Sequence, residues 1–156
     1  MAEPVGLSDS MCESADGKLV GAWKLVSASS TTSSGERSET PYGPSPVGFL
    51  TYTAEGRVTA LISYGGRESL TFGGGTQEEQ AEAFKTFLAY AGRYSLSGDK
   101  VIHHVEISSI PNYVDKDLIR SVKFEGDRIV LVTPPTRLNG KLQTVELIWQ
   151  RLPVGS

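Results

Sequence analysis

The chain has 156 residues, the size of one domain, and this length is enough to bury a single hydrophobic core. With a net charge of −3, a pI near 5.4 and no basic run, it has no electrostatic footprint for a polyanion, so we expect no nucleic-acid partner. No stretch approaches the ~20 apolar residues of a membrane span and no secretion signal is visible, so we expect a cytoplasmic protein without a membrane partner.

The first 17 residues are mostly small and polar and predict a flexible leader, 1–17, ahead of one folded domain, 18–153. The single cysteine, Cys12, lies in this leader, so the chain can form no internal disulfide and has no CxxC motif. Since frayed termini rarely hold catalytic groups in place, we do not expect Cys12 to act as a nucleophile.

From Leu19 onward, short apolar or alternating runs are separated by pairs of residues that favour tight turns. Gly, Asn and Asp tolerate positive φ, and such pairs between two β-rich runs are typical of hairpins. The pairs are Glu55-Gly56, Gly98-Asp99, Gly126-Asp127 and Asn139-Gly140. The predicted strands cover 19–29, 48–53, 57–64, 93–96, 101–108, 118–124, 128–133 and 143–152. Together they form an antiparallel meander.

Two segments early in the chain are predicted to connect strands. The Ser- and Thr-rich run at 27–39, SASSTTSSGERSE, is either a mobile tip or a solvated edge strand, and we favour the mobile tip. The loop at 40–48, TPYGPSPVG, contains three prolines and two glycines, which make it a stiff crossing segment and a poor strand.

One segment, TQEEQAEAFKTFLAYAG at 76–92, predicts a helix. It opens with Thr76 and carries Glu79 three residues later, which is a capping-box signature. Apolar residues follow at helical spacing before Gly92, namely Phe84, Phe87, Leu88 and Ala91. The pattern indicates an amphipathic helix whose apolar stripe covers another part of the protein.

A meander of about eight strands removes its exposed edges by closing on itself. We therefore expect an all-β protein, a closed antiparallel up-and-down β-barrel of about eight strands, with one amphipathic α-helix inserted before the C-terminal half. A barrel of this size has room for side chains or one small ligand. The helix could plug or cover one end.

Six segments of the chain resemble, in order, the small stand-alone proteins of the lipocalin-like domain family. They are LVGAWKLVS (19–27), PYGPSPVGFLTYTAEGRV (41–58), FLAYAGRYSL (87–96), VIHHVEISSIPNYV (101–114), IRSVKFEGDRIVLVTPP (119–135) and LIWQRL (147–152). The resemblance extends from about Leu19 to Leu152 and implies a closed antiparallel barrel of a kind found in bacteria and fungi. It also implies that Arg151 packs on Trp23, the tryptophan of a GxW signature.

The only two histidines are adjacent, in the run VIHHVEIS. Because consecutive strand residues point to opposite faces, at most one of them can face the barrel interior. Val101, His103, Val105 and Ile107 form the more apolar face, opposite Ile102, His104, Glu106 and Ser108. We therefore expect His103 inside and His104 outside, and no metal site from the pair.

The following strand places Arg120, Val122 and Phe124 on its apolar face. A buried arginine without a partner is costly, and the adjacent strands offer no inward acidic residue. A ligand carboxylate, enolate or polarised carbonyl is therefore a sensible partner for Arg120; the alternative is a structural anchor to backbone carbonyls or to the Trp23 end.

The residues predicted to act in catalysis are His103, Arg120 and Tyr94. Those predicted to line a ligand site are Tyr64, Tyr52, Ile62, Val105, Phe124, Tyr90, Tyr113 and Trp149. His103 is either a proton-transfer group or a core histidine satisfied by a neighbouring tyrosine.

No hydrolase, zinc-protease, dinucleotide or P-loop motif is present, and nothing calls for a cofactor. The first hypothesis is a cofactor-independent cyclase or isomerase that acts on a small hydrophobic natural-product intermediate. Other small barrels serve secondary metabolism as pericyclases, and the analogy in fold extends the hypothesis to a pericyclase-like activity. The alternative is a carrier that binds a small hydrophobic acid or phenol without changing it. A homodimer is compatible with either hypothesis.

Overall fold

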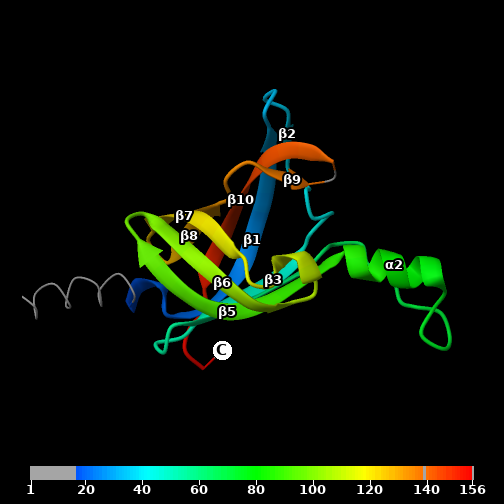
Figure 1. Cartoon of the computed structure of the whole chain (residues 1–156), viewed down its shortest axis with the longest axis horizontal. Helices are drawn as coiled ribbons and strands as arrows, with labels where there is room; N and C mark the ends of the chain where they lie inside the picture. The colour runs from blue at the N-terminus through cyan, green and yellow to red at the C-terminus, as the bar shows by residue number, and fades with distance from the viewer. Residues whose placement is uncertain (1–16, 139, 156) are drawn as a thin grey trace, which may run out of the picture.

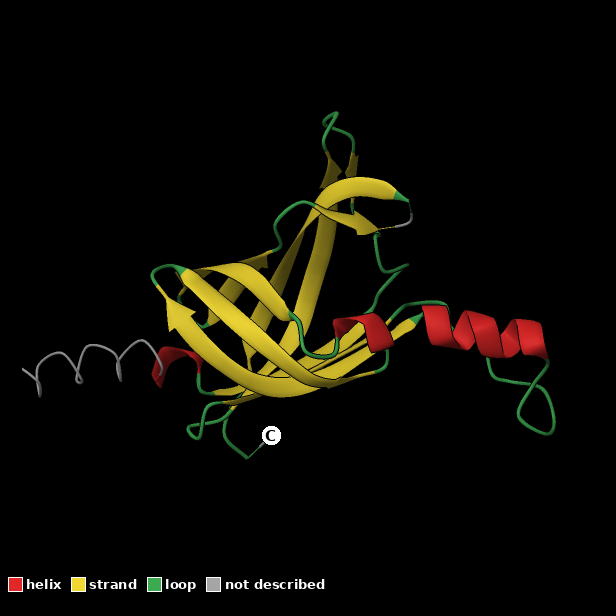
Figure 2. Cartoon of the chain, in the orientation of Figure 1, coloured by secondary structure: helices red, strands yellow, loops and turns green. Residues whose placement is uncertain are grey.

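The strands of the computed structural model, which describes residues 17–138 and 140–155, form a closed antiparallel β-barrel (Figures 1 and 2). The eight barrel strands are β1 (Gly21–Thr32), β3 (Val47–Tyr52), β4 (Arg57–Ser63), β5 (Phe87–Ser97), β6 (Lys100–Ser108), β7 (Asp117–Glu125), β8 (Arg128–Val132) and β10 (Lys141–Arg151). Each strand pairs with the next in this order, and β10 pairs with β1 to close the barrel. The predicted fold class is confirmed. Residues 1–16 of the expected leader, including Cys12, lie outside the described residues.

Two short strands extend the sheet where β1 and β10 run beyond the barrel (Figure 1). β2 (Arg37–Ser38) pairs with the end of β1, and β9 (Thr136–Leu138) pairs with the start of β10. The prediction of a mobile tip at 27–39 is therefore wrong, because most of this segment is strand. Ser30 pairs with Ser38 across the hairpin and also with Val145 of β10. Backbone hydrogen bonds on both sides therefore hold this polar segment in place, although it has little apolar surface to bury.

One end of the barrel is sealed by the GxW segment. The Trp23 indole Nε1 donates to the carbonyl of Leu19 at 2.9 Å, and both side chains are fully buried. The Arg151 guanidinium lies 4.2 Å from the centre of the Trp23 ring and donates to the carbonyls of Val20 and Lys18. The predicted packing of Arg151 on Trp23 is confirmed.

The helix α2 (Gln77–Lys85) begins as predicted but ends early. Thr76 Oγ1 accepts from the Glu79 N–H at 3.1 Å, and Glu79 Oε1 accepts from the Thr76 N–H at 2.8 Å, which completes the capping box. Phe87 and the residues after it belong to β5, where they pair with β4 and β6. The prediction that the helix runs on to residue 91 is wrong.

No residue of α2 is buried, and the helix projects away from the barrel (Figure 2). Phe84, expected on its covered apolar stripe, is 52% exposed. The helix therefore neither plugs nor covers the barrel. No helix among residues 17–138 and 140–155 is long and apolar enough to cross a membrane.

A β-bulge interrupts the pairing of β5 with β6. Ala91 lies opposite Ile107, whereas Gly92 lies opposite Val105, so Glu106 is an extra residue in β6. A Cβ at Gly92 would lie 1.9 Å from the carbonyl oxygen of His104, which explains why a residue without a side chain occupies this position. The bulge turns Ile107 to the outer face, where it is 66% exposed, so its predicted inward orientation is wrong.

Candidate functional site

His103 of β6 lies inside the barrel between two tyrosines, one from the adjacent strand β5 and one from β3. Its Nε2 is 2.7 Å from the Tyr52 hydroxyl of β3, and its Nδ1 is 2.6 Å from the Tyr90 hydroxyl of β5. All three side chains are buried. His104 points outward, where its ring nitrogens contact Asp117 at 2.8 Å and Ser95 at 2.9 Å.

The buried histidine is electrically neutral. Burial lowers the pKa of His103 to about 3, and electrostatic interactions with Arg120 and His104 act in the same direction. A neutral imidazole has one donor and one acceptor nitrogen. One tyrosine therefore donates its hydroxyl proton to His103 and the other accepts the ring N–H, so both nitrogens are satisfied.

The two tyrosines are also neutral. Burial raises the pKa of the Tyr52 hydroxyl and of the Tyr90 hydroxyl. The charge of Arg120 opposes both changes. The interior thus holds a chain of three neutral polar side chains beside one positive charge.

Next to this chain lies a cavity of about 40 Å³. Its polar lining consists of Tyr42, Tyr90, His103, Arg120, Thr133 and Trp149, and aliphatic side chains form the rest. A space of this size holds little more than a water molecule, whereas pockets for small organic ligands measure about 300–1,000 Å³. The barrel interior is therefore largely filled by its own side chains.

Two of the lining residues carry strong hydrogen-bond donors. Trp149 is 2% exposed, and its indole Nε1 is buried with no hydrogen-bond partner among the described residues. Arg120 is half-buried; it donates to the carbonyl of Ile119 at 3.0 Å, and no carboxylate among the described residues forms an ion pair with it. Buried polar groups usually have partners, so an unpaired donor beside a cavity suits an acceptor atom that occupies the cavity.

Five of the predicted site residues line the cavity: Ile62, Tyr90, His103, Arg120 and Trp149. Tyr52 contacts His103 but does not line the cavity, and Val105 is buried in the core. Tyr94 stacks edge-on against Tyr52 at 4.8 Å and donates its hydroxyl to the carbonyl of Thr53 at 3.0 Å, so it is not placed at the cavity.

Three other predicted residues lie farther out. Tyr64 and Tyr113 are half-buried and pack against the core. Tyr113 is in the 3-10 helix η1 (Pro111–Tyr113). Phe124 is 39% exposed near the end of β7, with Lys18 Nζ 5.5 Å from its ring centre, and it does not line the cavity.

Sequence reasoning missed Tyr42, which lines the cavity from the proline-rich loop between β2 and β3. Its ring centre is 5.0 Å from that of Tyr64, and burial raises the pKa of its hydroxyl. The loop packs so tightly on the segment after β4 that a Cβ at Gly65 would overlap the carbonyl of Pro44. The glycines at 65 and 66 were the available signal for this close approach. Thr133, Leu131 and Leu147 were also missed as lining residues, although strand alternation places them inside.

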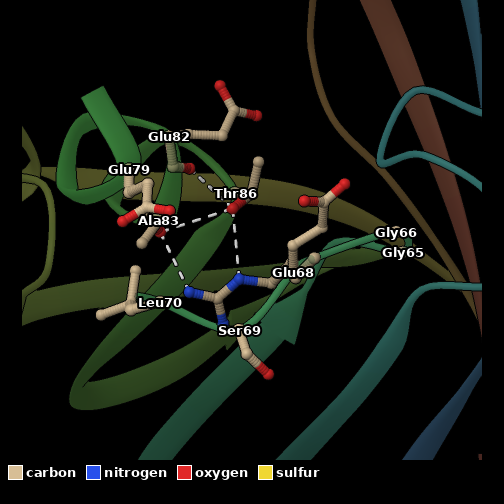
Figure 3. A pocket seen from close by; sticks show the side chains of 10 residues that line it. Gly65, Gly66, Glu68, Ser69, Leu70, Glu79, Glu82, Ala83 and Thr86 are labelled. Carbon is tan, nitrogen blue, oxygen red and sulfur yellow. Dashed lines mark hydrogen bonds between the residues drawn. The ribbon is translucent and has the colours of Figure 1, made fainter. Parts of the chain in front are cut away.

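A larger hollow of about 310 Å³ lies between the 65–70 segment and α2 (Figure 3). Arg67 crosses it and donates to the Thr86 hydroxyl and to the Ala83 carbonyl, each at 3.2 Å, as the dashed lines in Figure 3 show. Glu79 is engaged in the capping box and also accepts from Thr71. These polar groups hold the segment against the helix end, so we assign the hollow a structural role.

Metal binding has no support in this part of the chain. No cluster of three or more His, Cys, Asp or Glu side chains that could hold a metal ion occurs among the described residues. His104 and Asp117 form a single pair on the outer face of the barrel.

The closed barrel, its GxW seal and its small interior agree with the sequence comparison. A family model described as a lipocalin-like domain matches residues 20–152. The chain belongs to the lipocalin-like domain family. This assignment confirms the family resemblance and covers nearly all of the described barrel.

A curated relative in Aspergillus oryzae is the 4'-hydroxy-3'-methoxypropiophenone carrier protein ppsC. It is 38% identical to this lipocalin-like chain over 95 residues, which cover 55% of this chain and 86% of that protein. Among solved structures, the crystal structure of Rv2717c from M. tuberculosis aligns with 90% of this chain and 96% of that chain. At 12% identity and a TM-score of 0.35, that similarity is too low to support a further statement.

Proposed function

We propose that this protein is a carrier, which binds a small aromatic phenol or aryl ketone inside the barrel and releases it unchanged. The observation that carries the proposal is the pair of donors at the cavity, the unpaired Trp149 Nε1 and the Arg120 guanidinium. A carbonyl or phenol oxygen would accept from both, while the aliphatic lining would contact the aromatic ring.

The name of the Aspergillus oryzae relative supports the same chemistry. That protein is a carrier for 4'-hydroxy-3'-methoxypropiophenone, a compound with a phenolic hydroxyl at one end of the ring and a ketone at the other. Both groups are hydrogen-bond acceptors, as the donors of Trp149 and Arg120 require.

The state of His103 favours binding over catalysis. A general acid or base needs a ring nitrogen within hydrogen-bond reach of the reacting atom. Both nitrogens of His103 are engaged by Tyr52 and Tyr90, and the ring is neutral over the physiological range. Cyclase or isomerase activity would require one of these hydrogen bonds to be exchanged for a substrate contact.

Ligand entry requires side chains to move, because the cavity of about 40 Å³ is smaller than an aromatic ring. Tyr42 is the side chain best placed to do so, since it lines the cavity from a loop and not from a barrel strand. Rotation of its ring away from Tyr64 would enlarge the cavity.

The experiment is a calorimetric titration of the protein with 4'-hydroxy-3'-methoxypropiophenone, followed by mass spectrometry of the recovered ligand. We expect saturable binding in the micromolar range and recovery of the unchanged compound. Trp149→Phe should weaken binding by about 2–10-fold, because it removes one hydrogen bond and keeps a ring in place.

Trp23→Phe is the matched control, since Trp23 lies at the sealed end and its Nε1 donates to Leu19. A folded Trp23→Phe protein should keep the wild-type Kd. Absence of saturable binding by the wild-type protein would refute the carrier proposal. Conversion of the compound would also refute it and would support the cyclase or isomerase hypothesis instead.

A further inference from the structure

We propose that the barrel site takes its ligand as an anion, a phenolate or a carboxylate, and that Arg120 is the residue that determines this preference. The inference rests on the proposed function and deepens it, because it specifies the ionisation state of the bound molecule. It starts from a positive charge that the described part of the protein does not neutralise.

Arg120 lies on β7 and reaches the cavity from the inner face of the barrel. Its guanidinium donates to the Ile119 carbonyl at 3.0 Å, which is an uncharged group. The acidic residues within five positions of it, Asp115, Asp117 and Glu125, are exposed; Asp117 pairs with His104 and Glu125 pairs with Lys123. No carboxylate among the described residues therefore compensates the guanidinium.

The other titratable groups around the cavity cannot supply the missing negative charge. Burial raises the pKa of the Tyr42, Tyr52 and Tyr90 hydroxyls and keeps all three protonated. Burial also keeps His103 neutral. The other titratable groups that act on Tyr42, namely Tyr64 and Tyr113, are phenols as well.

The charge of Arg120 affects the pKa values of four side chains in this interior. It opposes the rise in pKa of Tyr42, Tyr52 and Tyr90, and it adds to the fall in pKa of His103. These groups come from a loop and three different strands, so Arg120 acts on several sides of the barrel interior. Charges in a partly desolvated site interact more strongly than they do in water.

A phenol with an acyl group para to its hydroxyl is more acidic than phenol itself, because the carbonyl group shares the negative charge of the phenolate. Such a ligand can adapt to the site by releasing its proton. Its phenolate oxygen would then accept from the Arg120 guanidinium in a charge-assisted hydrogen bond, which is roughly twice as strong as a neutral one. Trp149 Nε1 can donate to the same molecule, since an indole nitrogen is a donor only.

The test is a spectroscopic pH titration of 4'-hydroxy-3'-methoxypropiophenone in the presence of excess protein, because phenolates absorb at longer wavelength than phenols. We expect the bound ligand to ionise at a pH at least one unit below that of the free ligand, which corresponds to at least tenfold tighter binding of the phenolate. The 4'-O-methyl ether, which cannot ionise, should bind more weakly and with little dependence on pH.

Arg120→Met should abolish the shift in ligand ionisation, whereas Arg120→Lys, which keeps the positive charge, should retain most of it. Arg128→Met is the control, since Arg128 is exposed and contacts Gln150. A bound ligand that ionises at or above the pH of the free ligand would overturn the inference and leave the carrier proposal intact. Failure of the wild-type protein to bind either compound would overturn both.

Discussion

The guanidinium carbon of Arg151 lies 4.2 Å from the centre of the Trp23 indole ring, and this contact joins the last barrel strand to the first. The same side chain donates to the Val20 and Lys18 carbonyls. Arg151→Met keeps an unbranched apolar chain but removes the cation–π contact and both hydrogen bonds. We expect the free energy of unfolding to fall by about 2–3 kcal/mol, measured by urea denaturation.

The control for this variant is Arg128→Met, which replaces an exposed arginine on the neighbouring strand. It should change the free energy of unfolding by less than about 0.5 kcal/mol. Equal effects of the two substitutions would show that the stack on Trp23 contributes nothing specific.

Position 92 requires glycine because any side chain would clash with the neighbouring strand, and not because of the backbone conformation. Gly92→Ala would place a Cβ 1.9 Å from the His104 carbonyl oxygen, so the bulge between β5 and β6 must deform. We expect a loss of about 3 kcal/mol or more in the free energy of unfolding. Gly98→Ala is the comparison, because Gly98 has open space around it and a φ of +61°; it should cost only about 1 kcal/mol.

His103 makes the stability of the protein depend on pH. Its folded pKa of about 3 lies below the ordinary value of 6.5, so the unfolded chain takes up the proton first. The contribution of His103 is complete above pH 6.5 and decreases as the pH falls from 6.5 toward 3. We expect the free energy of unfolding to fall by about 1.5 kcal/mol between pH 6.5 and pH 5, measured by urea denaturation at each pH.

His103→Gln should flatten this dependence, since glutamine can donate and accept but does not titrate. The wild-type and His103→Gln proteins should be compared above pH 5. Hydrogen bonds lower the pKa values of Glu79 and Glu106 from 4.5, so these groups also change the free energy of unfolding at lower pH. An unchanged slope in His103→Gln would assign the pH dependence to other groups.

Thr76 stabilises α2 without stabilising the barrel. Thr76→Ala removes the side-chain half of the capping box and should destabilise the helix by about 1 kcal/mol. Because no residue of α2 is buried, hydrogen exchange of the α2 amides should accelerate while the urea midpoint of the barrel stays the same. Gln77→Ala, which keeps the cap, should change neither; a lower urea midpoint in Thr76→Ala would mean that α2 supports the barrel.

Much of the barrel could be predicted because its strands combine alternating burial with turn-forming pairs. The orientation of His103 follows from such alternation, as does that of Tyr64 at the end of its hairpin. The start of β5 could not be predicted in this way, since Phe87, Leu88 and Ala91 fit helical spacing as well as a strand. Pairing with β4 and β6, which is a tertiary effect, decides between the two.

The partners of His103 were harder to predict than His103 itself. Helical spacing predicts Tyr90 on the helix, and strand alternation leaves the direction of Tyr52 ambiguous. The extra residue Glu106 also reverses the two faces of β6 beyond Val105, and nothing in the local sequence of β6 marks this point. Tyr42 comes from a loop, where no periodicity indicates the direction of a side chain.

The seam between β1 and β10 has a consequence for how the protein is made. The hydrogen bond from Arg151 to Val20 joins residues 131 positions apart, and contacts of such sequence separation form slowly. During synthesis β1 can pair with β3, but its other edge stays open until residues 141–151 have left the ribosome. An open strand edge is a template for aggregation. The nascent chain is therefore most exposed to misassembly just before its last strand arrives.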